Sequence, residues 1–206
     1  MRKLWILGSL LLANMAHAEN NTREVPAFTA IKCRCAFNLS VEVGKAQSIT
    51  LKGNDKFNAK VITEVAGNEL IISYKDKNSF SIKDDAQVLV TVPSLSRFRM
   101  EGAGVARINN INTDDLEISY EGAGMLTAAG KAKNLRLKAQ GVGMVETKDL
   151  QTERADVSVE GIGSVSVHAK EKLNASVQGI GSLTYYGHPR NLSKSVDGIG
   201  SIKAGD

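Results

Sequence analysis

Cysteine, histidine, proline and aromatic residues are all scarce in this 206-residue chain, which has 2 cysteines, 3 histidines, 3 prolines and 1 tryptophan. So few imidazoles disfavour a histidine-centred catalytic triad and a metal site built from several histidines. The Gly-x-Ser-x-Gly element of many hydrolases is also missing. Apolar spacing typical of helices is nearly absent, whereas Gly, Ser, Val and Ile are frequent. The composition therefore predicts an all-β protein, and we expect no enzymatic activity, no metal and no cofactor.

Charge of one sign is not concentrated anywhere in the sequence. The 26 Lys and Arg residues alternate with 22 Asp and Glu residues, and the formal net charge is +4. A phosphate backbone is normally bound by a basic stripe, so nucleic acid is disfavoured as a partner. Arg97, Arg99, Arg136 and Lys138 are the positions at which an anionic glycan would be bound.

Long hydrophobic runs are limited to the first residues of the chain. Arg2 and Lys3 precede an apolar run over 4–13, and Ala16-His17-Ala18 is a small-x-small cleavage site. This order predicts a signal peptide over residues 1–18, followed by a linker over 19–27. The run is too short for a transmembrane helix, which needs roughly 20 apolar residues. We expect an exported protein, periplasmic or at the cell surface, without a transmembrane segment in the mature chain.

The two cysteines, Cys33 and Cys35, are separated by one residue. In a strand, residues i and i+2 point to the same face. After export to an oxidising compartment they are predicted to form a local disulfide or to remain as two partly buried thiols. A single C-x-C pair without a second ligand pair is a weak zinc signal.

A Gly-x-Gly element is repeated six times in the second half of the chain, every 18–20 residues. The paired glycines are Gly102/Gly104, Gly122/Gly124, Gly141/Gly143, Gly161/Gly163, Gly179/Gly181 and Gly198/Gly200. The residues before each element alternate between apolar and polar with period two, as in a half-buried strand. After the glycines this alternation shifts phase, which indicates a bend, and glycine suits a bend because it lacks a Cβ and tolerates a positive φ. Both glycines of each pair are therefore predicted to be structural.

A strand, a glycine corner, a second strand and a polar connection make one coil of a single-stranded β-helix. The sequence therefore predicts a β-solenoid over 93–206 with about six coils of 18–20 residues, preferably right-handed. Residues 28–92 lack the repeat and are predicted to form a smaller β-rich region that caps the N-terminal end. Its expected strands are 36–43, 48–51, 60–65, 69–74 and 87–92.

The most suggestive polar positions directly precede the first glycine of each element. They are occupied by Glu101, Glu121, Gln140, Glu160, Gln178 and Asp197. On stacked coils they should form an outward row, of which the first four members, with Arg99 and Lys138 beside them, are the predicted ligand contacts. Closely spaced carboxylates are also compatible with acid/base hydrolysis of a glycan or with Ca²⁺ binding. A solvated face that keeps the solenoid soluble is the favoured interpretation.

The repeated glycine element, Val92-Pro93-Ser94-Leu95 and Tyr186-Gly187-His188-Pro189 together resemble the GIN-domain family of autotransporter adhesin heads. The resemblance runs from about residue 28 to the end of the chain. It implies a β-helical fold, an exported location and an adhesive role, and it implies no catalytic residues.

These observations predict a noncatalytic cell-envelope protein that binds or builds structure through the regular faces of a solenoid. Its partner would be a glycan, an envelope polymer, another protein or a second copy of the chain. Two alternatives remain at this point: a polysaccharide-active enzyme of β-helix type and a self-associating envelope scaffold.

Overall fold

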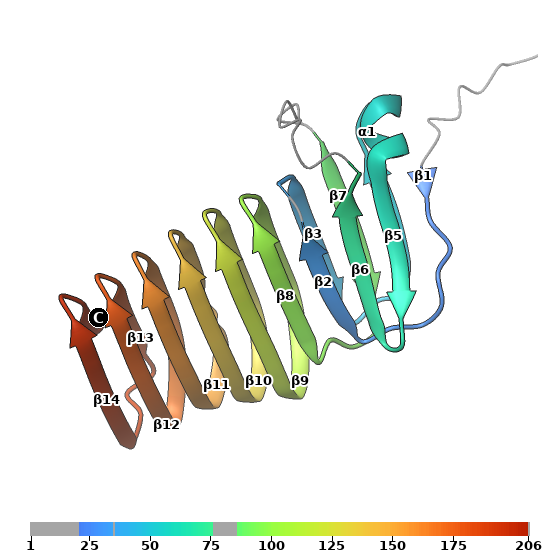
Figure 1. The fold of residues 1–206 in the computed structure, drawn as a ribbon. Helices are drawn as coiled ribbons and strands as arrows, with labels where there is room; N and C mark the ends of the chain where they lie inside the picture. Colours follow the sequence, from blue (N-terminus) through green and yellow to red (C-terminus); the bar gives the residue numbers. More distant parts are fainter. Residues whose placement is uncertain (1–20, 35, 76–85, 206) are drawn as a thin grey trace, which may run out of the picture.

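The computed structural model describes residues 21–34, 36–75 and 86–205, and these residues form a flattened β-solenoid (Figure 1). The predicted signal peptide, residues 1–18, lies outside the described residues. The N-terminal elements are β1 (Asn21–Thr22), β2 (Ala30–Arg34), β3 (Asn38–Val43), β4 (Ser48–Lys52), α1 (Asp55–Lys60), β5 (Val61–Ala66), β6 (Glu69–Tyr74), β7 (Gln87–Val92) and β8 (Arg97–Gly102). The remaining strands are β9 (Val105–Gly122), β10 (Met125–Gly141), β11 (Met144–Gly161), β12 (Ser164–Gly179), β13 (Ser182–Tyr186), β14 (Asn191–Gly198) and β15 (Ser201–Ala204). This arrangement confirms the predicted all-β solenoid.

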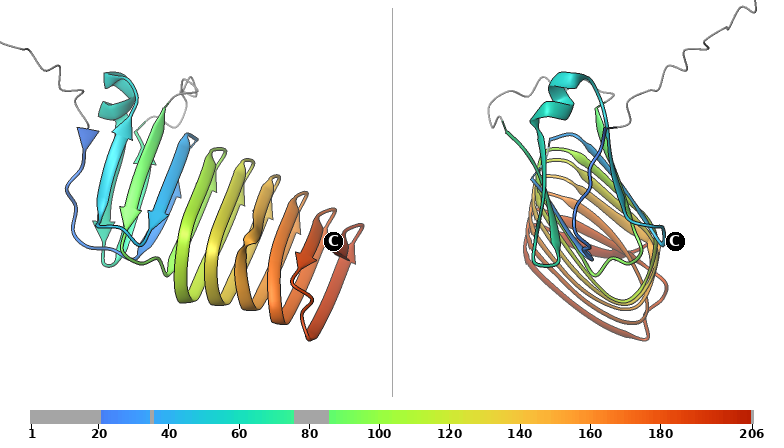
Figure 2. Two further views of the ribbon diagram at one scale, coloured as in Figure 1. Left: turned by 180° about the vertical axis from the view of Figure 1, so that it is seen from behind. Right: turned by 90° about the vertical axis from the view of Figure 1, so that its right-hand side faces the viewer.

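Each long strand from β9 to β12 runs from one Gly-x-Gly element to the next and crosses both faces of the molecule. The end-on view in Figure 2 shows these flattened coils stacked behind one another. Face A contains β3, β7, β13, β15 and the first halves of β9–β12. Face B contains β2, β6, β8, β14 and the second halves of β9–β12, and neighbouring coils pair in parallel on both faces.

The solenoid makes about five turns rather than six. Six Gly-x-Gly elements bound only five complete intervals, because the first element ends β8 and the last one precedes the short strand β15. The repeat length was therefore predicted correctly, and the number of coils was one too high.

The N-terminal region joins both sheets of the solenoid. β2 lies between β6 and β8, so Ile31 is in register with Leu70 on one side and Phe98 on the other. In the same way, β3 lies between β7 and the first half of β9. Antiparallel pairs, β4 with β7 and β5 with β6, complete this end of the molecule. The domain boundaries given above stay a prediction.

The core lies between the two faces and is built from rows of inward-pointing side chains. One row contains Ile31, Phe98 and Ile118, each 0% exposed and in register on β2, β8 and β9. Full burial of such a side chain contributes roughly 1.5–3 kcal/mol. These rows connect the N-terminal strands to the repeats through one continuous apolar interior.

At the Gly-x-Gly corner, successive coils approach each other backbone to backbone. Gly161 has a φ of +113°, and a Cβ built on it would lie 2.6 Å from the carbonyl oxygen of Gly141. The amide of Ile162 donates a hydrogen bond to that oxygen at 2.9 Å. Glycine is thus required here by its backbone conformation and by the spacing of the coils.

The second glycine of each element differs from the first in its backbone conformation. Positive φ is confined to the first glycine of each pair. The second glycines, which lack it, are Gly104, Gly124, Gly143, Gly163, Gly181 and Gly200. Crowding explains glycine at most of these positions: a Cβ on Gly163 would lie 2.9 Å from the carbonyl oxygen of Gly143, although one on Gly181 would come no nearer than 3.1 Å to a side-chain atom of Val159. The bend therefore depends on the first glycine, and the second allows the close stacking of coils.

Two further predictions concern the cysteine pair and membrane-spanning segments. Cys33 is buried in β2, whereas Cys35 lies outside the described residues, so their disulfide stays a prediction. Within the described part of the chain, no helix is long and apolar enough to cross a membrane.

Candidate functional site

The row predicted before the glycines forms along the edge of face B. Strand register places its members side by side on β8, β9, β10, β11, β12 and β14. They are, in order, Glu101, Glu121, Gln140, Glu160, Gln178 and Asp197. The alternation of polar and apolar residues was thus sufficient to place this row.

Glu101, at the N-terminal end of the row, is neutralised by two cations from β2. Lys32 Nζ lies 2.6 Å from one carboxylate oxygen, and Arg34 Nε lies 3.0 Å from the other. Burial raises the pKa of the Glu101 carboxyl, but the hydrogen bonds and charges of Lys32 and Arg34 outweigh burial, and the pKa lies below its ordinary value. Glu101 is therefore an ionised partner in an internal ion pair.

Glu160 is held in a similar way by the neighbouring coil. Gln140 Nε2 donates a hydrogen bond to one carboxylate oxygen at 2.5 Å, and Lys138 Nζ lies 3.3 Å from the other. These two contacts, the amide first, lower the pKa of Glu160. Arg99 is likewise paired, 3.6 Å from Glu117. The predicted contact residues thus interact with their neighbours, and Glu121 alone among them has no such partner within the described chain.

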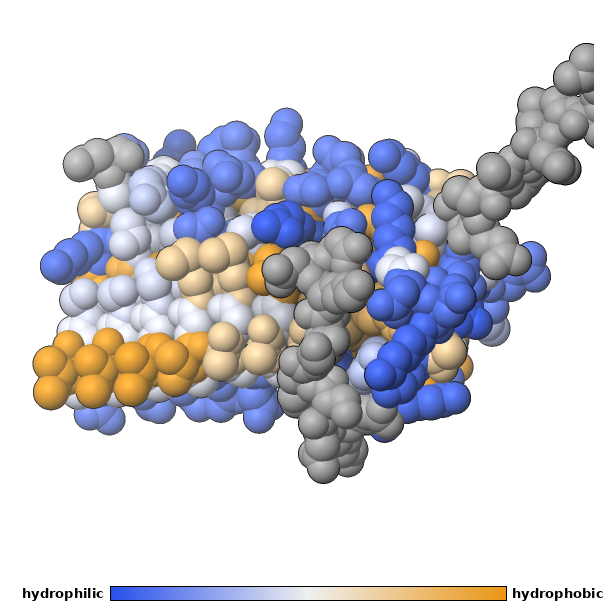
Figure 3. Space-filling view, turned by 90° about the horizontal axis from the view of Figure 1, so that it is seen from above, coloured by the Kyte–Doolittle hydropathy of each residue, from blue (hydrophilic) through white to orange (hydrophobic). Residues whose placement is uncertain are grey.

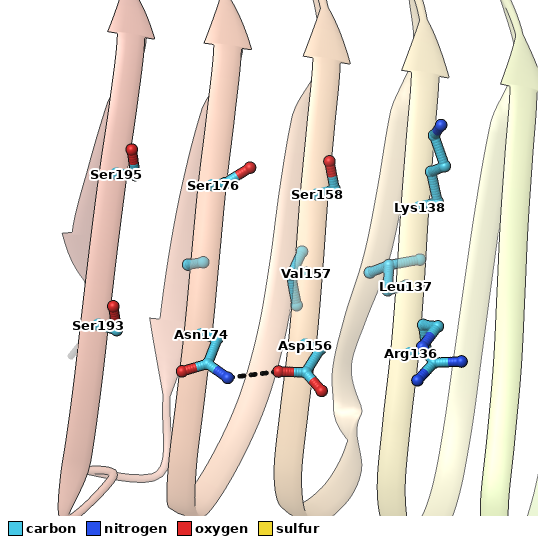
Figure 4. A pocket seen from close by; sticks show the side chains of 11 residues that line it. Arg136, Leu137, Lys138, Asp156, Val157, Ser158, Asn174, Ser176, Ser193 and Ser195 are labelled. Atoms are coloured by element: carbon cyan, nitrogen blue, oxygen red, sulfur yellow. Dashed lines mark hydrogen bonds between the residues drawn. The ribbon is translucent and has the colours of Figure 1, made fainter.

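A trough of about 370 Å³ lies beside this row on face B. Figure 4 shows two parallel rows of side chains on β10, β11, β12 and β14 that line it. One row is Lys138, Ser158, Ser176 and Ser195, and the other is Arg136, Asp156, Asn174 and Ser193. Asn174 Nδ2 donates a hydrogen bond to Asp156 Oδ1 at 2.5 Å. The trough presents hydroxyl, amide and charged groups, and its lining also includes Leu137, Val157 and Ala175 but no aromatic side chain.

A family model described as "Putative auto-transporter adhesin, head GIN domain" matches residues 27–189. The chain belongs to this family. A putative adhesin from Bacteroides fragilis NCTC 9343 is 25% identical, with 89% of this chain and 94% of that chain covered and a TM-score of 0.75. No curated protein matches the chain.

A second solved structure is similar in fold alone. It is a putative lipid binding protein from Parabacteroides distasonis ATCC 8503, 19% identical, with a TM-score of 0.53. The alignment covers 91% of this chain and 96% of that chain. The relationship therefore extends over both the N-terminal strands and the repeats.

The GIN domain also carries an apolar ridge that the sequence analysis did not identify. Figure 3 shows a straight row of hydrophobic residues along one edge of the molecule. The middle residues of the last four Gly-x-Gly elements are exposed: Val142 by 56%, Ile162 by 55%, Ile180 by 58% and Ile199 by 83%. The available signal was a branched apolar residue between two glycines, because a tight corner leaves its middle side chain pointing outward.

Ligating groups do not gather into a metal site in the described residues. No group of three or more His, Cys, Asp or Glu side chains there is placed to hold a metal ion. The carboxylates of the predicted row are instead spread along the edge of face B, with Gln140 and Gln178 between them. What the arrangement offers chemically is a regular set of hydrogen-bonding and ionic contacts.

Proposed function

We propose that this GIN-domain chain is an exported, noncatalytic binding module of the cell envelope with an adhesin-like role. Membership of the adhesin-head family and the likeness to the Bacteroides fragilis putative adhesin support an adhesin-like role. Export is inferred from the signal peptide predicted over residues 1–18. The single observation that carries the binding role is the set of polar rows held in register across face B.

These rows suit binding by many weak contacts. From β8 to β12, each side chain extends from a strand paired on both sides, so little backbone freedom is lost when a ligand binds. A ligand that spans several coils gains a similar contact at each coil, and tethered contacts strengthen one another through effective concentration. A long, regular ligand is therefore bound better than a short one.

The lowered pKa values of Glu101 and Glu160 argue against the polysaccharide-active alternative. A glycosidase general acid must be protonated near neutral pH, which requires a raised pKa. Ion pairs and hydrogen bonds in this structure keep both carboxylates ionised instead. The arrangement favours binding over hydrolysis.

The experiment that tests the proposal measures binding and turnover on the same samples. The purified protein is applied to an array of glycans and envelope polymers, and released sugar is assayed in parallel. Selective binding without released sugar is the expected result. Release of sugar would establish the enzyme alternative, and failure to bind any arrayed polymer would remove the adhesin-like role.

Removing Glu121 and Glu160 together tests the predicted row. If the row contacts the ligand, Glu121→Ala with Glu160→Ala is expected to weaken binding at least fivefold and leave the thermal midpoint almost unchanged, because both side chains face solvent. A double variant at Asp114 and Glu153, on the corner opposite the glycines, removes the same charge and serves as the control. Equal affinity of both double variants would exclude the row as a contact surface.

Self-association is a second candidate role, and the apolar ridge favours it. Exposed apolar residues in a continuous row commonly mark interaction sites. We expect Ile162→Ser with Ile180→Ser to shift the sedimentation coefficient of the concentrated protein toward that of the monomer. Leu192→Ser is the control, since Leu192 is 40% exposed but lies outside the ridge. A wild-type protein that stays monomeric at every concentration would dismiss this role.

A further inference from the structure

We infer that the trough on face B is the ligand site and that it binds an extended glycan with an acidic group at the Arg136 and Lys138 end. This inference rests on the proposed function as a binding module. The ligand contacts then lie on a surface next to the row that precedes the glycines, from Glu101 to Asp197, which we call the glutamate row. The ligand belongs to the class of acidic glycans.

The trough arises from differences in side-chain length between neighbouring rows. Ser158, Ser176 and Ser195 form its floor on three adjacent strands. Two residues earlier on β11 and β12, on the same face, the longer side chains of Asp156 and Asn174 form one wall, whereas β14 has Ser193 at this position. Two residues later on the three strands, on the other side of the serines, lie Glu160, Gln178 and Asp197. On β11 and β12 the short hydroxyl side chains therefore lie between longer polar side chains.

The recess crosses the strands and is periodic. Adjacent strands are about 4.8 Å apart, so the four strands that line the trough span roughly 14 Å. Along this length the same hydroxyl position recurs on β11, β12 and β14. A ligand with one hydroxyl-bearing unit per coil would repeat its hydrogen bonds at each strand, and an extended chain of sugars is such a ligand.

The lining groups disfavour the other classes of macromolecule. A peptide that adds a strand needs an unpaired sheet edge. Among the strands that line the trough, β10, β11 and β12 are paired on both sides, and only the outer edge of β14 is open. The apolar lining residues, Leu137, Val157 and Ala175, are buried, so they offer little exposed side chain to an apolar peptide or a lipid. Nucleic acid is disfavoured by Asp156 and by the glutamate row, because both carry negative charge.

Arg136, beside Lys138 at one end of the trough, is the group that would favour an acidic sugar. Arg136 is exposed and has no ion-pair or hydrogen-bond partner among the described residues. Its guanidinium can donate two parallel hydrogen bonds to one carboxylate or sulfate. Lys138 is bound to Glu160 on the side away from Arg136, which holds the ammonium beside the trough. The opposite end, at Ser193 and Ser195, has no cation among its lining residues.

Filling the recess tests its assignment. The purified protein is applied to an array of linear glycans that are neutral, contain uronic acid or are sulfated. Wild type is expected to bind extended acidic glycans best. Ser176→Trp, which places an indole in the centre of the floor, is expected to reduce this binding at least tenfold. Thr184→Trp makes the same change on a half-exposed position of face A and is expected to bind like wild type. Equal binding by the two tryptophan variants would overturn the assignment.

Removing the charge tests the chemical class without changing the shape of the floor. Arg136→Gln is expected to weaken binding of a uronic-acid glycan about tenfold and to leave binding of the carboxyl-reduced form of the same glycan unchanged. An equal loss of binding for both forms of the glycan would contradict the role of Arg136 in recognising the acidic group.

The same measurements separate this inference from the proposed function. If wild type binds an arrayed polymer and Ser176→Trp binds it equally well, the protein is a binding module whose site lies elsewhere. If wild type binds no glycan but binds a non-glycan envelope polymer, the binding role stands and the glycan inference fails. If wild type binds nothing, both are wrong.

Discussion

Alanine in place of Gly161 is expected to reduce the free energy of unfolding by about 3 kcal/mol or more, because two separate costs combine at this position. The φ of Gly161 is +113°, a conformation that residues with a Cβ rarely adopt. The added Cβ would also lie 2.6 Å from the carbonyl oxygen of Gly141, which accepts the hydrogen bond of Ile162. Relief of the contact would separate two coils at the corner. Urea denaturation followed by far-ultraviolet circular dichroism measures the loss.

Gly67 supplies the matched control for this prediction. It also has a positive φ, +62°, but a Cβ built there would meet nothing within 4 Å. Gly67→Ala should therefore have only the conformational cost, about 1 kcal/mol. Similar losses for the two variants would show that the stacking of backbone at the glycine corner contributes little to stability.

The repeats made most of the solenoid predictable. A period-two pattern fixed which side chains point inward, and the Gly-x-Gly spacing fixed where each coil bends. The strands expected over 69–74 and 87–92 coincide with β6 and β7, and the other three predicted strands agree within two residues. Local patterns are informative here because each coil repeats the same order of strand, glycine corner and second strand.

Long-range pairing in the N-terminal region could not be read from the sequence. β2 contains five residues, and it pairs with β6 and β8, which lie far away along the chain. No local pattern specifies such an insertion between two other strands. Helix α1 was also missed, because its Asn54 N-cap, whose side chain accepts a hydrogen bond from the Phe57 amide, resembles an ordinary turn residue.

The same limit applies to the candidate site. The row through Glu101 and Glu160 was placed correctly, but the ion pair between Arg34 and Glu101 joins residues separated by 67 positions. The recess over Ser158 and Ser176 depends on longer side chains in the neighbouring rows. A pattern along one strand shows which residues point outward, whereas the shape of a trough depends on the side chains of several neighbouring strands.

Loss of the Phe98 ring is the second change with a large expected effect. Phe98 is 0% exposed and lies in register between Ile31 of β2 and Ile118 of β9. Truncation of a buried phenylalanine to alanine removes apolar contacts and leaves a cavity, so Phe98→Ala is expected to cost about 3–5 kcal/mol. Phe98→Leu, which retains much of the volume, should cost roughly 1–2 kcal/mol.

The shape of the urea transition for Phe98→Ala shows whether the N-terminal strands and the repeats unfold together. One sheet runs without interruption from β6 through β2 and β8 into β9, the other from β7 through β3 into β9, and one apolar cluster fills the interior. We therefore expect a single transition with an unchanged urea dependence and a lower midpoint. Two transitions, with the second at the wild-type midpoint, would mean that the repeats fold independently of β2. In that case the row containing Phe98 would join two separate cooperative units, and the solenoid would keep its ligand-binding face after the N-terminal strands had unfolded.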